Sequence, residues 1–105
     1  RRMFLDHNFL SGRIPGSLGN LYHLQSLFIN SNNLSGELPE NLGNLRSLQW
    51  FHAHFNKISG EIPASFNNLS NLLELKIHNN RLRGKAPDEL NKNPYIRVNH
   101  FNINI

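Results

Sequence analysis

The 105 residues contain no cysteine and no threonine. Without cysteine there is no disulfide framework and no thiolate zinc site, so neither of these holds the fold together. The same absence does not distinguish an oxidising compartment from a reducing one. Apolar runs are short, far below the ~20 residues that span a bilayer, which excludes membrane insertion by these residues. The chain opens with no charged and then apolar leader, so we predict no targeting signal within it.

Charge of one sign is not concentrated anywhere in the sequence. The chain has 11 Lys and Arg against 7 Asp and Glu, a formal charge of +4. A positive balance favours an acidic partner, but the basic residues are scattered and form no block. We therefore do not expect nucleic acid as a partner. The length is that of about one domain.

Asparagine and leucine are in excess, because 18 Asn and 17 Leu make up a third of the chain. Self-comparison explains both excesses, since the sequence repeats every 24 residues without an insertion. The repeat is marked by Gly12, Gly36, Gly60 and Gly84, by Pro15, Pro39, Pro63 and Pro87, and by Asn8, Asn32, Asn56, Asn80 and Asn104. Apolar columns keep the same step, which a single globular core would not require.

Each repeat predicts one short strand. Apolar residues alternate at Leu27 and Ile29, the period of a strand with one buried face. Such a strand cannot bury its apolar face alone, but stacked coils build a continuous core and a parallel sheet, so we predict a solenoid. Phe51 and Ala53 replace the usual pair of aliphatic residues at roughly constant summed volume, which indicates ordinary repacking.

The asparagine column predicts a buried ladder. A buried polar side chain is tolerated when its hydrogen bonds are made, and Asn carries both an amide donor and a carbonyl acceptor. The glycine of each Ser-Gly step suits a left-handed or crowded backbone, and the proline three residues later excludes a helix interior. The side of the solenoid opposite the strands should therefore consist of turns, extended segments and 3₁₀ pieces.

Residues 21–44 read LYHLQSLFINSNNLSGELPENLGN. They resemble the plant-type leucine-rich repeat, LxxLxxLxLxxNxLSGxIPxxLGN, with one conservative change, Leu38 for Ile, and the resemblance covers nearly the whole chain. It implies an α/β solenoid, a right-handed superhelix with a concave parallel β-sheet, and a second short strand around the Ser-Gly-x-Ile-Pro segment. Proteins of this kind are mostly ectodomains of plant receptor-like kinases and receptor-like proteins, together with secreted polygalacturonase inhibitors.

The predicted organisation is a single leucine-rich repeat array over residues 1–105. It comprises a partial repeat 1–20, full repeats 21–44, 45–68 and 69–92, and a partial, degenerate repeat 93–105. Loss of pattern toward the end is typical of a terminal repeat. The family usually closes both ends with cysteine-bearing caps, which this sequence lacks. We therefore expect a segment, or a degraded copy, of a longer array, and a parent protein could carry a Ser/Thr kinase domain.

Function in such a scaffold should lie on the positions around the two strand leucines that packing leaves free. These positions form columns, one of which runs Phe9, Asn33, Lys57 and Arg81. Aromatic rings beside cations are typical of recognition surfaces. The alternative is that some rings merely pack against one another. The predicted ligand-binding residues of the concave face are Phe4, Phe28, Trp50, His52, His54, Phe55, Lys76, His78 and Arg81.

The histidines suggest two further hypotheses. His54 and His78 share a column and should lie ~5 Å apart, with His52 about 7 Å away. A metal site is nevertheless not expected, because Glu74 and Asp6 lie in other columns and supply no acidic ligand in register. A pH sensor is the milder hypothesis. Protonation of all 6 His would take the formal charge from +4 toward +10 near pH 5 and strengthen binding to an acidic partner.

No catalytic motif or cofactor-binding motif is present, so we predict neither an enzyme nor a cofactor. The only Asp residues, Asp6 and Asp88, lie in distant coils, and no Ser stands near a His with a carboxylate to orient it. Two acceptor sequons for N-glycosylation begin at Asn33 and Asn68. The repeat consensus itself produces Asn-Leu-Ser, so these sequons are a hypothesis only.

The leading functional hypothesis combines the resemblance with the aromatic and histidine columns. It is a segment of a plant receptor-like kinase or receptor-like protein ectodomain that binds a peptide, protein ligand or co-receptor through the concave face. It would lie at the extracellular face of the plasma membrane or in the cell wall. The alternative is a secreted inhibitor of cell-wall polygalacturonase. A third hypothesis, ice binding, usually needs ranks of small hydroxyl residues, and the chain has no Thr. The sequence does not indicate the oligomeric state.

Overall fold

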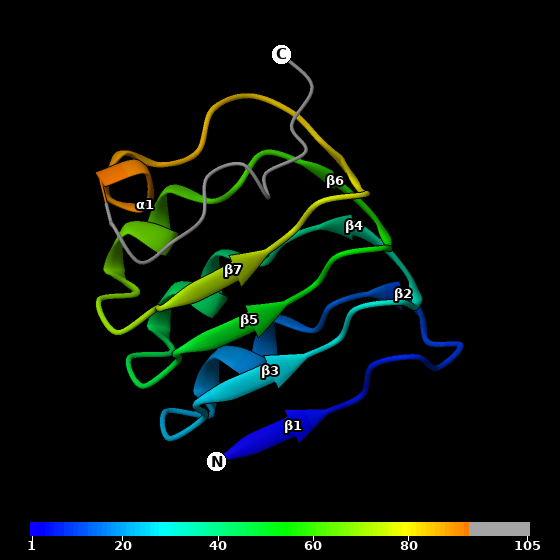
Figure 1. Cartoon of the computed structure of the whole chain (residues 1–105), viewed down its shortest axis with the longest axis horizontal. Helices are drawn as coiled ribbons and strands as arrows, with labels where there is room; N and C mark the ends of the chain where they lie inside the picture. Colours follow the sequence, from blue (N-terminus) through cyan, green and yellow to red (C-terminus); the bar gives the residue numbers. More distant parts are fainter. Residues whose placement is uncertain (93–105) are drawn as a thin grey trace.

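The computed structural model describes residues 1–92, without the side chain of Asn91. The predicted degenerate repeat 93–105 and the fifth ladder position, Asn104, lie outside the described residues. Within them, stacked coils each contribute one strand to each of two parallel sheets, and the first three coils contribute a 3₁₀ turn, as the solenoid prediction requires (Figure 1). The fold prediction is therefore confirmed, including the second short strand that the resemblance implied.

The first sheet consists of the strands that the leucine columns predict. It has the order β1-β3-β5-β7, with bounds β1 Arg2–Phe4, β3 Ser26–Phe28, β5 Trp50–His52 and β7 Glu74–Lys76. All neighbours pair in parallel, with Met3 opposite Leu27 and Leu27 opposite Phe51. The register therefore equals the sequence repeat, and residues of one sequence column lie side by side across this sheet.

The second sheet has the order β2-β4-β6-β8, with bounds β2 Ser11–Arg13, β4 Asn33–Glu37, β6 Lys57–Gly60 and β8 Arg81–Leu82. Here the register differs, because Asn33 pairs with Ser11 and Lys57 pairs with Ser35. Each strand is thus displaced by two residues relative to the sequence repeat. The prediction that Phe9, Asn33, Lys57 and Arg81 stack as one column is therefore wrong, because Asn33, Lys57 and Arg81 begin staggered strands and pair with Ser11, Ser35 and Ser59.

Short helices form the side of the coil between the second strand and the next first strand. They are the 3₁₀ turns η1 Gly16–Asn20, η2 Glu40–Asn44 and η3 Ala64–Asn68, and the α-helix α1 Asp88–Lys92. Successive turns pack closely, because a Cβ on Gly43 would lie 2.5 Å from the carbonyl oxygen of Ser65. The predicted 3₁₀ side is confirmed, with α1 as a one-turn exception. None of the described helices has the length and apolarity needed to cross a membrane.

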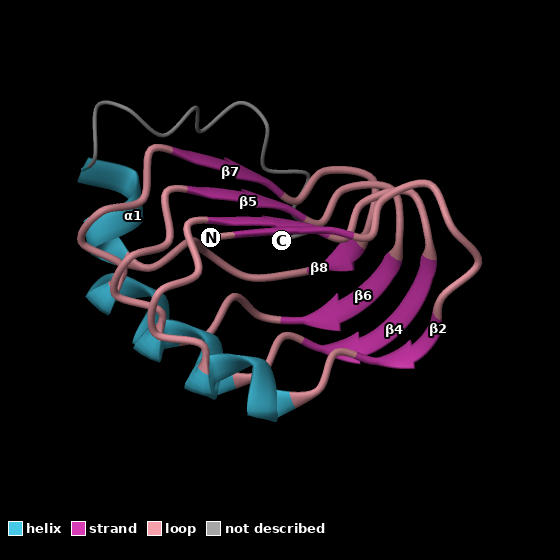
Figure 2. Cartoon of the chain, turned by 90° about the horizontal axis from the view of Figure 1, so that it is seen from below, coloured by secondary structure: helices cyan, strands magenta, loops and turns pink. Residues whose placement is uncertain are grey.

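The two sheets and the short helices surround the core (Figure 2). The side chains that fill it are mainly those of the apolar columns. Phe51 and Ala53 are both fully buried. The Phe51 ring meets Phe66 edge-on, with ring centroids 6.2 Å apart. Phe66 replaces a leucine of the neighbouring coils, and it is fully buried together with Phe51 and Ala53. This packing supports the repacking interpretation of the Phe51 and Ala53 pair.

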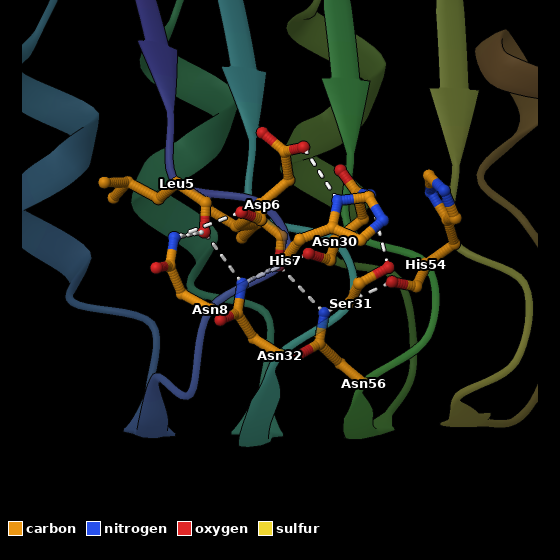
Figure 3. Close-up of polar contacts among 10 residues, drawn as sticks. Leu5, Asp6, His7, Asn8, Asn30, Ser31, Asn32, His54 and Asn56 are labelled. Atoms are coloured by element: carbon orange, nitrogen blue, oxygen red, sulfur yellow. Dashed lines mark hydrogen bonds and ion pairs between the residues drawn. The ribbon is translucent and has the colours of Figure 1, made fainter.

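The asparagine ladder closes the turn after each strand of the first sheet. Asn56 Nδ2 donates to the carbonyls of Ile29 in the preceding coil, 3.0 Å away, and of Ala53 in its own coil, 3.1 Å away. Its Oδ1 accepts from the Leu34 N–H at 3.0 Å. Asn32 and Asn80 repeat this pattern, each with one donated and one accepted bond to the preceding coil and a further donated bond within its own. Figure 3 shows the bond from Asn32 to the carbonyl of Leu5 in the preceding coil.

The ladder is less uniformly buried than the sequence predicts. Asn56 is buried, whereas Asn32 and Asn80 are half-buried. Asn8 is exposed and donates only within its own turn, to the carbonyls of Leu5 and Asp6. The difference follows from position in the stack, because no preceding coil lies beside Asn8 among the described residues.

The glycine column combines the two properties that the sequence predicts. Gly36, Gly60 and Gly84 have φ between +77° and +80°, the left-handed region. A Cβ on Gly36 would also lie 2.8 Å from the Arg13 side chain of the preceding coil. Any other residue at this position would therefore meet both backbone strain and a steric clash.

We predict that Asn56→Ala lowers the free energy of unfolding by about 3 kcal/mol, because buried backbone groups in two coils lose their partners. Asn8→Ala is the matched control and should change it by about 0.5 kcal/mol or less, since its hydrogen bonds are local and exposed. Urea denaturation followed by circular dichroism measures both values. Equal losses of unfolding free energy in the two variants would contradict a stabilising role for the hydrogen bonds between coils.

Candidate functional site

The concave surface is the outer face of the first sheet. In Figure 2 this sheet forms one side of the molecule, and the short helices lie on the opposite side of the core. Because the register of this sheet equals the sequence repeat, the outward columns are spatial columns as well. One correction applies: Ser26 occupies an outward position but is buried, so not every outward position is available to a partner.

Three rings stack across neighbouring strands of the concave surface. The centroids of Phe4 and Phe28 lie 5.0 Å apart, and those of Phe28 and His52 lie 4.1 Å apart with the rings parallel to within 1°. Lys76 follows in register with His52 on β7. Phe4 remains exposed over about half of its surface. The rings therefore support one another and still present apolar area to solvent.

A second group of rings lies just beyond the ends of β5 and β7. His54 and His78 stack with centroids 4.7 Å apart, which agrees with the ~5 Å expected for neighbours in one column. Phe55 meets both rings edge-on, at 5.6 Å from His54 and 5.5 Å from His78. His52 connects this group to the first, with its centroid 5.5 Å from that of His54.

The remaining predicted residues lie apart from these rings. Trp50 is half-buried on β5, in register with Glu74. Arg81 is exposed but lies on β8, in the second sheet, and so is not on a strand of the concave surface. Asn33 and Asn68 are both exposed, on β4 and at the end of η3.

Carboxylates reach two of the histidines. His52 Nε2 lies 2.5 Å from Glu74 Oε1, a diagonal contact between β5 and β7. Glu74 does lie in another column, in register with Trp50 as predicted, but its long side chain reaches His52 across the diagonal. His7 Nδ1 bonds Asp6 Oδ2 at 2.9 Å, which lowers the pKa of Asp6 (Figure 3). The described residues nevertheless contain no group of three His, Asp or Glu side chains that could hold a metal ion.

His54 is the histidine whose protonation the fold opposes. Burial lowers its pKa to about 4, and the charges of His78, His52 and Lys76 act in the same direction. Its Nδ1 is buried and makes no hydrogen bond with a described residue. The prediction that all histidines become charged near pH 5 is therefore wrong for His54, because this ring stays neutral there and the charge remains below +10.

Phe55 has a property that the sequence reasoning missed. Its φ is +57°, and the equivalent residues His7, Ser31 and Asn79 have φ between +55° and +58°. The fold thus imposes a left-handed residue at this turn in every described coil. Asn and His tolerate this conformation better than most residues, whereas a bulky side chain is unusual there and costs about 1 kcal/mol or more. The Asn and Ser of this column were the available sequence signal.

The lowered pKa of His54 predicts a stability that depends on pH. The unfolded chain takes up a proton near pH 6.5 and the folded chain only near pH 4, so protonation favours unfolding between these values. We expect the contribution of neutral His54 to the free energy of unfolding to be complete above pH 6.5 and to fall by about 1 kcal/mol toward pH 4. The fall is small because solvent screens a partly buried ring. His54→Gln should flatten this part of the curve, whereas His23→Gln in an exposed turn should not. Parallel curves for both variants and the wild type would contradict this assignment.

Comparison with known proteins supports this architecture. Residues 1–21, 23–45, 47–69 and 71–93 match the family model for the leucine rich repeat, a repeat scaffold and not a catalytic domain. No curated protein matches the chain.

Several solved structures are similar to the chain. The structure of PEPR1–AtPEP1 aligns with a TM-score of 0.86 and 36% identity over 90% of this chain and 13% of that chain. The Arabidopsis receptor kinase HAESA, in complex with the peptide hormone IDA and the co-receptor SERK1, aligns with a TM-score of 0.81 and 36% identity over 88% and 15%. A plant ice-binding protein aligns with a TM-score of 0.83 and 30% identity over 97% and 34%.

The chain thus spans less than a sixth of the two receptor chains and about a third of the ice-binding protein. The repeat match extends over nearly the whole described chain, and the stacked coils have the parallel sheets expected of such repeats. The chain therefore belongs to the leucine-rich repeat family, of the plant type found in these receptor kinases.

Proposed function

We propose that these residues are part of the ectodomain of a plant receptor-like kinase or receptor-like protein, and that the concave surface binds a peptide or protein ligand or a co-receptor. The similarity to HAESA, whose structure contains a peptide hormone and a co-receptor, supports this proposal. The ectodomain would lie on the extracellular face of the plasma membrane. The receptor similarity does not favour the polygalacturonase-inhibitor alternative.

The observation that carries the proposal is the continuous ring surface on the first sheet. Phe4, Phe28 and His52 stack across three strands, and Phe4 and Phe55 each expose about half of their surface. Exposed, mutually supported aromatic rings offer apolar area at a low cost in side-chain entropy, which is typical of binding hot spots. Lys76, beside His52, adds a positive charge to the same surface.

Ice binding is the second candidate, because a plant ice-binding protein shares the fold at 30% identity. The concave surface of this chain consists of aromatic and charged side chains and lacks a rank of small hydroxyl groups, since the chain has no Thr and Ser26 is buried. Thermal hysteresis of the purified chain tests this candidate directly. The receptor proposal expects none.

A random peptide display library tests the proposed binding surface. Selection on the immobilised wild-type chain should enrich peptides whose affinity falls about tenfold or more in Phe28→Asp, because a charge then replaces the centre of the ring stack. Tyr22→Asp is the matched control, since Tyr22 is half-exposed in the turn between η1 and β3 and should leave binding unchanged. Enriched peptides that bind both variants alike would overturn the proposal.

We also propose that Asn33 and Asn68 accept N-linked glycans when the chain is secreted. Both side chains are exposed, whereas Leu34 and Leu69 beside them are buried, so a glycan at either position leaves the core intact. Asn68, at the end of η3, lies on the helix side and leaves the concave surface uncovered.

Expression of the chain with a secretory leader in plant cells tests this modification. Treatment with peptide N-glycosidase should reduce its mass, and Asn68→Gln should remove part of that reduction. Ser70→Ala, which destroys the same sequon and keeps the asparagine, should have the same effect. An unchanged mass after enzyme treatment of the secreted wild type would exclude occupancy of both sites.

A further inference from the structure

Phe55 is a bulky residue in a backbone conformation that suits small polar residues. Its φ of +57° is imposed by the turn, and the same position holds His7, Ser31 and Asn79 in the other coils. Strain of this kind persists where the surrounding structure fixes it, and it gathers at functional sites. A turn that served only to connect two strands would be better made with the Asn found one coil later.

Burial does not compensate for this strain. About half of the Phe55 surface is exposed, and its ring meets only the edges or faces of His54 and His78 at 5.5–5.6 Å. The ring of Phe51, in contrast, lies fully inside the core. Phe55 therefore contributes an exposed ring to the concave surface at a cost to the fold.

The three rings form one aromatic cluster, in which the Phe55 ring is exposed over about half of its surface. His54 and His78 stack at 4.7 Å, and Phe55 stands across both of them. His54 is neutral at physiological pH, so it presents a planar aromatic face without a charge. An aromatic side chain of a partner can stack on such faces or meet their edges.

The charges near this ring cluster are unbalanced. The carboxylate of Glu74 is engaged by His52 and that of Asp6 by His7. Lys76, the last residue of β7, lies two residues before His78, and its charge acts on His54. Lys57 follows Phe55 by two residues, at the start of β6. Arg81 begins β8. Among the described residues, none of these three cations forms an ion pair. The positive charge next to the ring cluster therefore favours carboxylates in a partner.

We propose that His54, Phe55 and His78 form the anchoring subsite of the concave surface, and that it takes an aromatic side chain flanked by carboxylates in an acidic peptide segment. The inference rests on the proposed function, because it assigns the chemistry of the partner to one part of the same surface. The aromatic ring packs against the exposed ring of Phe55, and the flanking carboxylates pair with the ammonium groups of Lys76 and Lys57.

Three pentapeptides test this chemistry on the whole 105-residue chain. They are Gly-Glu-Trp-Glu-Gly, Gly-Lys-Trp-Lys-Gly and Gly-Glu-Ala-Glu-Gly, titrated while the imidazole signals of His54 and His78 are followed by NMR. We expect the first peptide to shift these signals and to bind about tenfold or more tightly than the other two. Equal affinities for the three peptides, or no shift with the first, would overturn the proposal.

Substitution of the anchor separates binding from folding. Phe55→Asn places at this position the residue that the next coil has there, Asn79. Its midpoint of thermal unfolding should equal or exceed that of the wild type. Its affinity for Gly-Glu-Trp-Glu-Gly should fall about tenfold or more. Phe55→Ser, which restores the residue of the preceding coil, should behave in the same way and serves as the second variant. Phe9→Asn is the matched control, because Phe9 is 99% exposed and should leave the affinity unchanged. Wild-type affinity in both Phe55 variants contradicts the assignment.

Two different results separate the assigned peptide chemistry from the binding surface itself. Display-selected peptides that depend on Phe28 but carry no acidic and aromatic pattern leave the receptor function intact and overturn the assigned chemistry. Selected peptides that are indifferent to Phe28 overturn the binding surface itself.

Discussion

The hydrogen bonds of the ladder asparagines are the constraint on which the rest of the structure depends. Each inner ladder side chain bonds to carbonyls of its own coil and of the preceding one, and it accepts a backbone N–H from the preceding coil. These bonds satisfy backbone groups that the sharp turn after the strand would otherwise bury without partners. They also fix the offset between coils at one sequence repeat. The parallel register of the first sheet, and with it every column of the concave surface, follows from this offset.

In-register pairing of the first sheet places aromatic residues of neighbouring coils side by side, so that their rings stack. The contacts of Phe28 with Phe4 and with His52 exist because the positions recur at the strand spacing of a sheet, which is close to the stacking distance of aromatic rings. The second sheet lacks this property, because its strands are displaced by two residues per coil. Only one face of the solenoid therefore gathers like side chains into continuous strips, and that face carries the residues that we assign to recognition.

Electrostatics make the two ends of the ring surface different. Near β1 and β5 the histidines His7 and His52 each have a carboxylate partner, whereas His54 is packed between rings and next to positive charges, so that its neutral form is favoured. The rings around Phe55 thus lie near the positive charge of Lys76, while the carboxylates of Asp6 and Glu74 are already paired with histidines. An uneven charge distribution of this kind allows a repetitive surface to bind a charged partner in one orientation.

The sequence by itself determined the repeat, the solenoid, the strands of the concave sheet, the asparagine ladder and the left-handed glycines. It also predicted which rings share a column and the spacing of His54 and His78, because in-register parallel pairing places residues one repeat apart at a fixed distance. Only the tertiary structure decided the two-residue displacement of the second sheet, the diagonal contact of Glu74 with His52, the burial of Ser26, the low pKa of His54 and the left-handed backbone of Phe55. These features depend on diagonal side-chain reach, on solvent exclusion between coils and on the closing geometry of the turn. Of these features, the left-handed turn alone left a trace in the sequence, the Asn and Ser of its column, because the others depend on contacts between coils that the residue pattern does not encode.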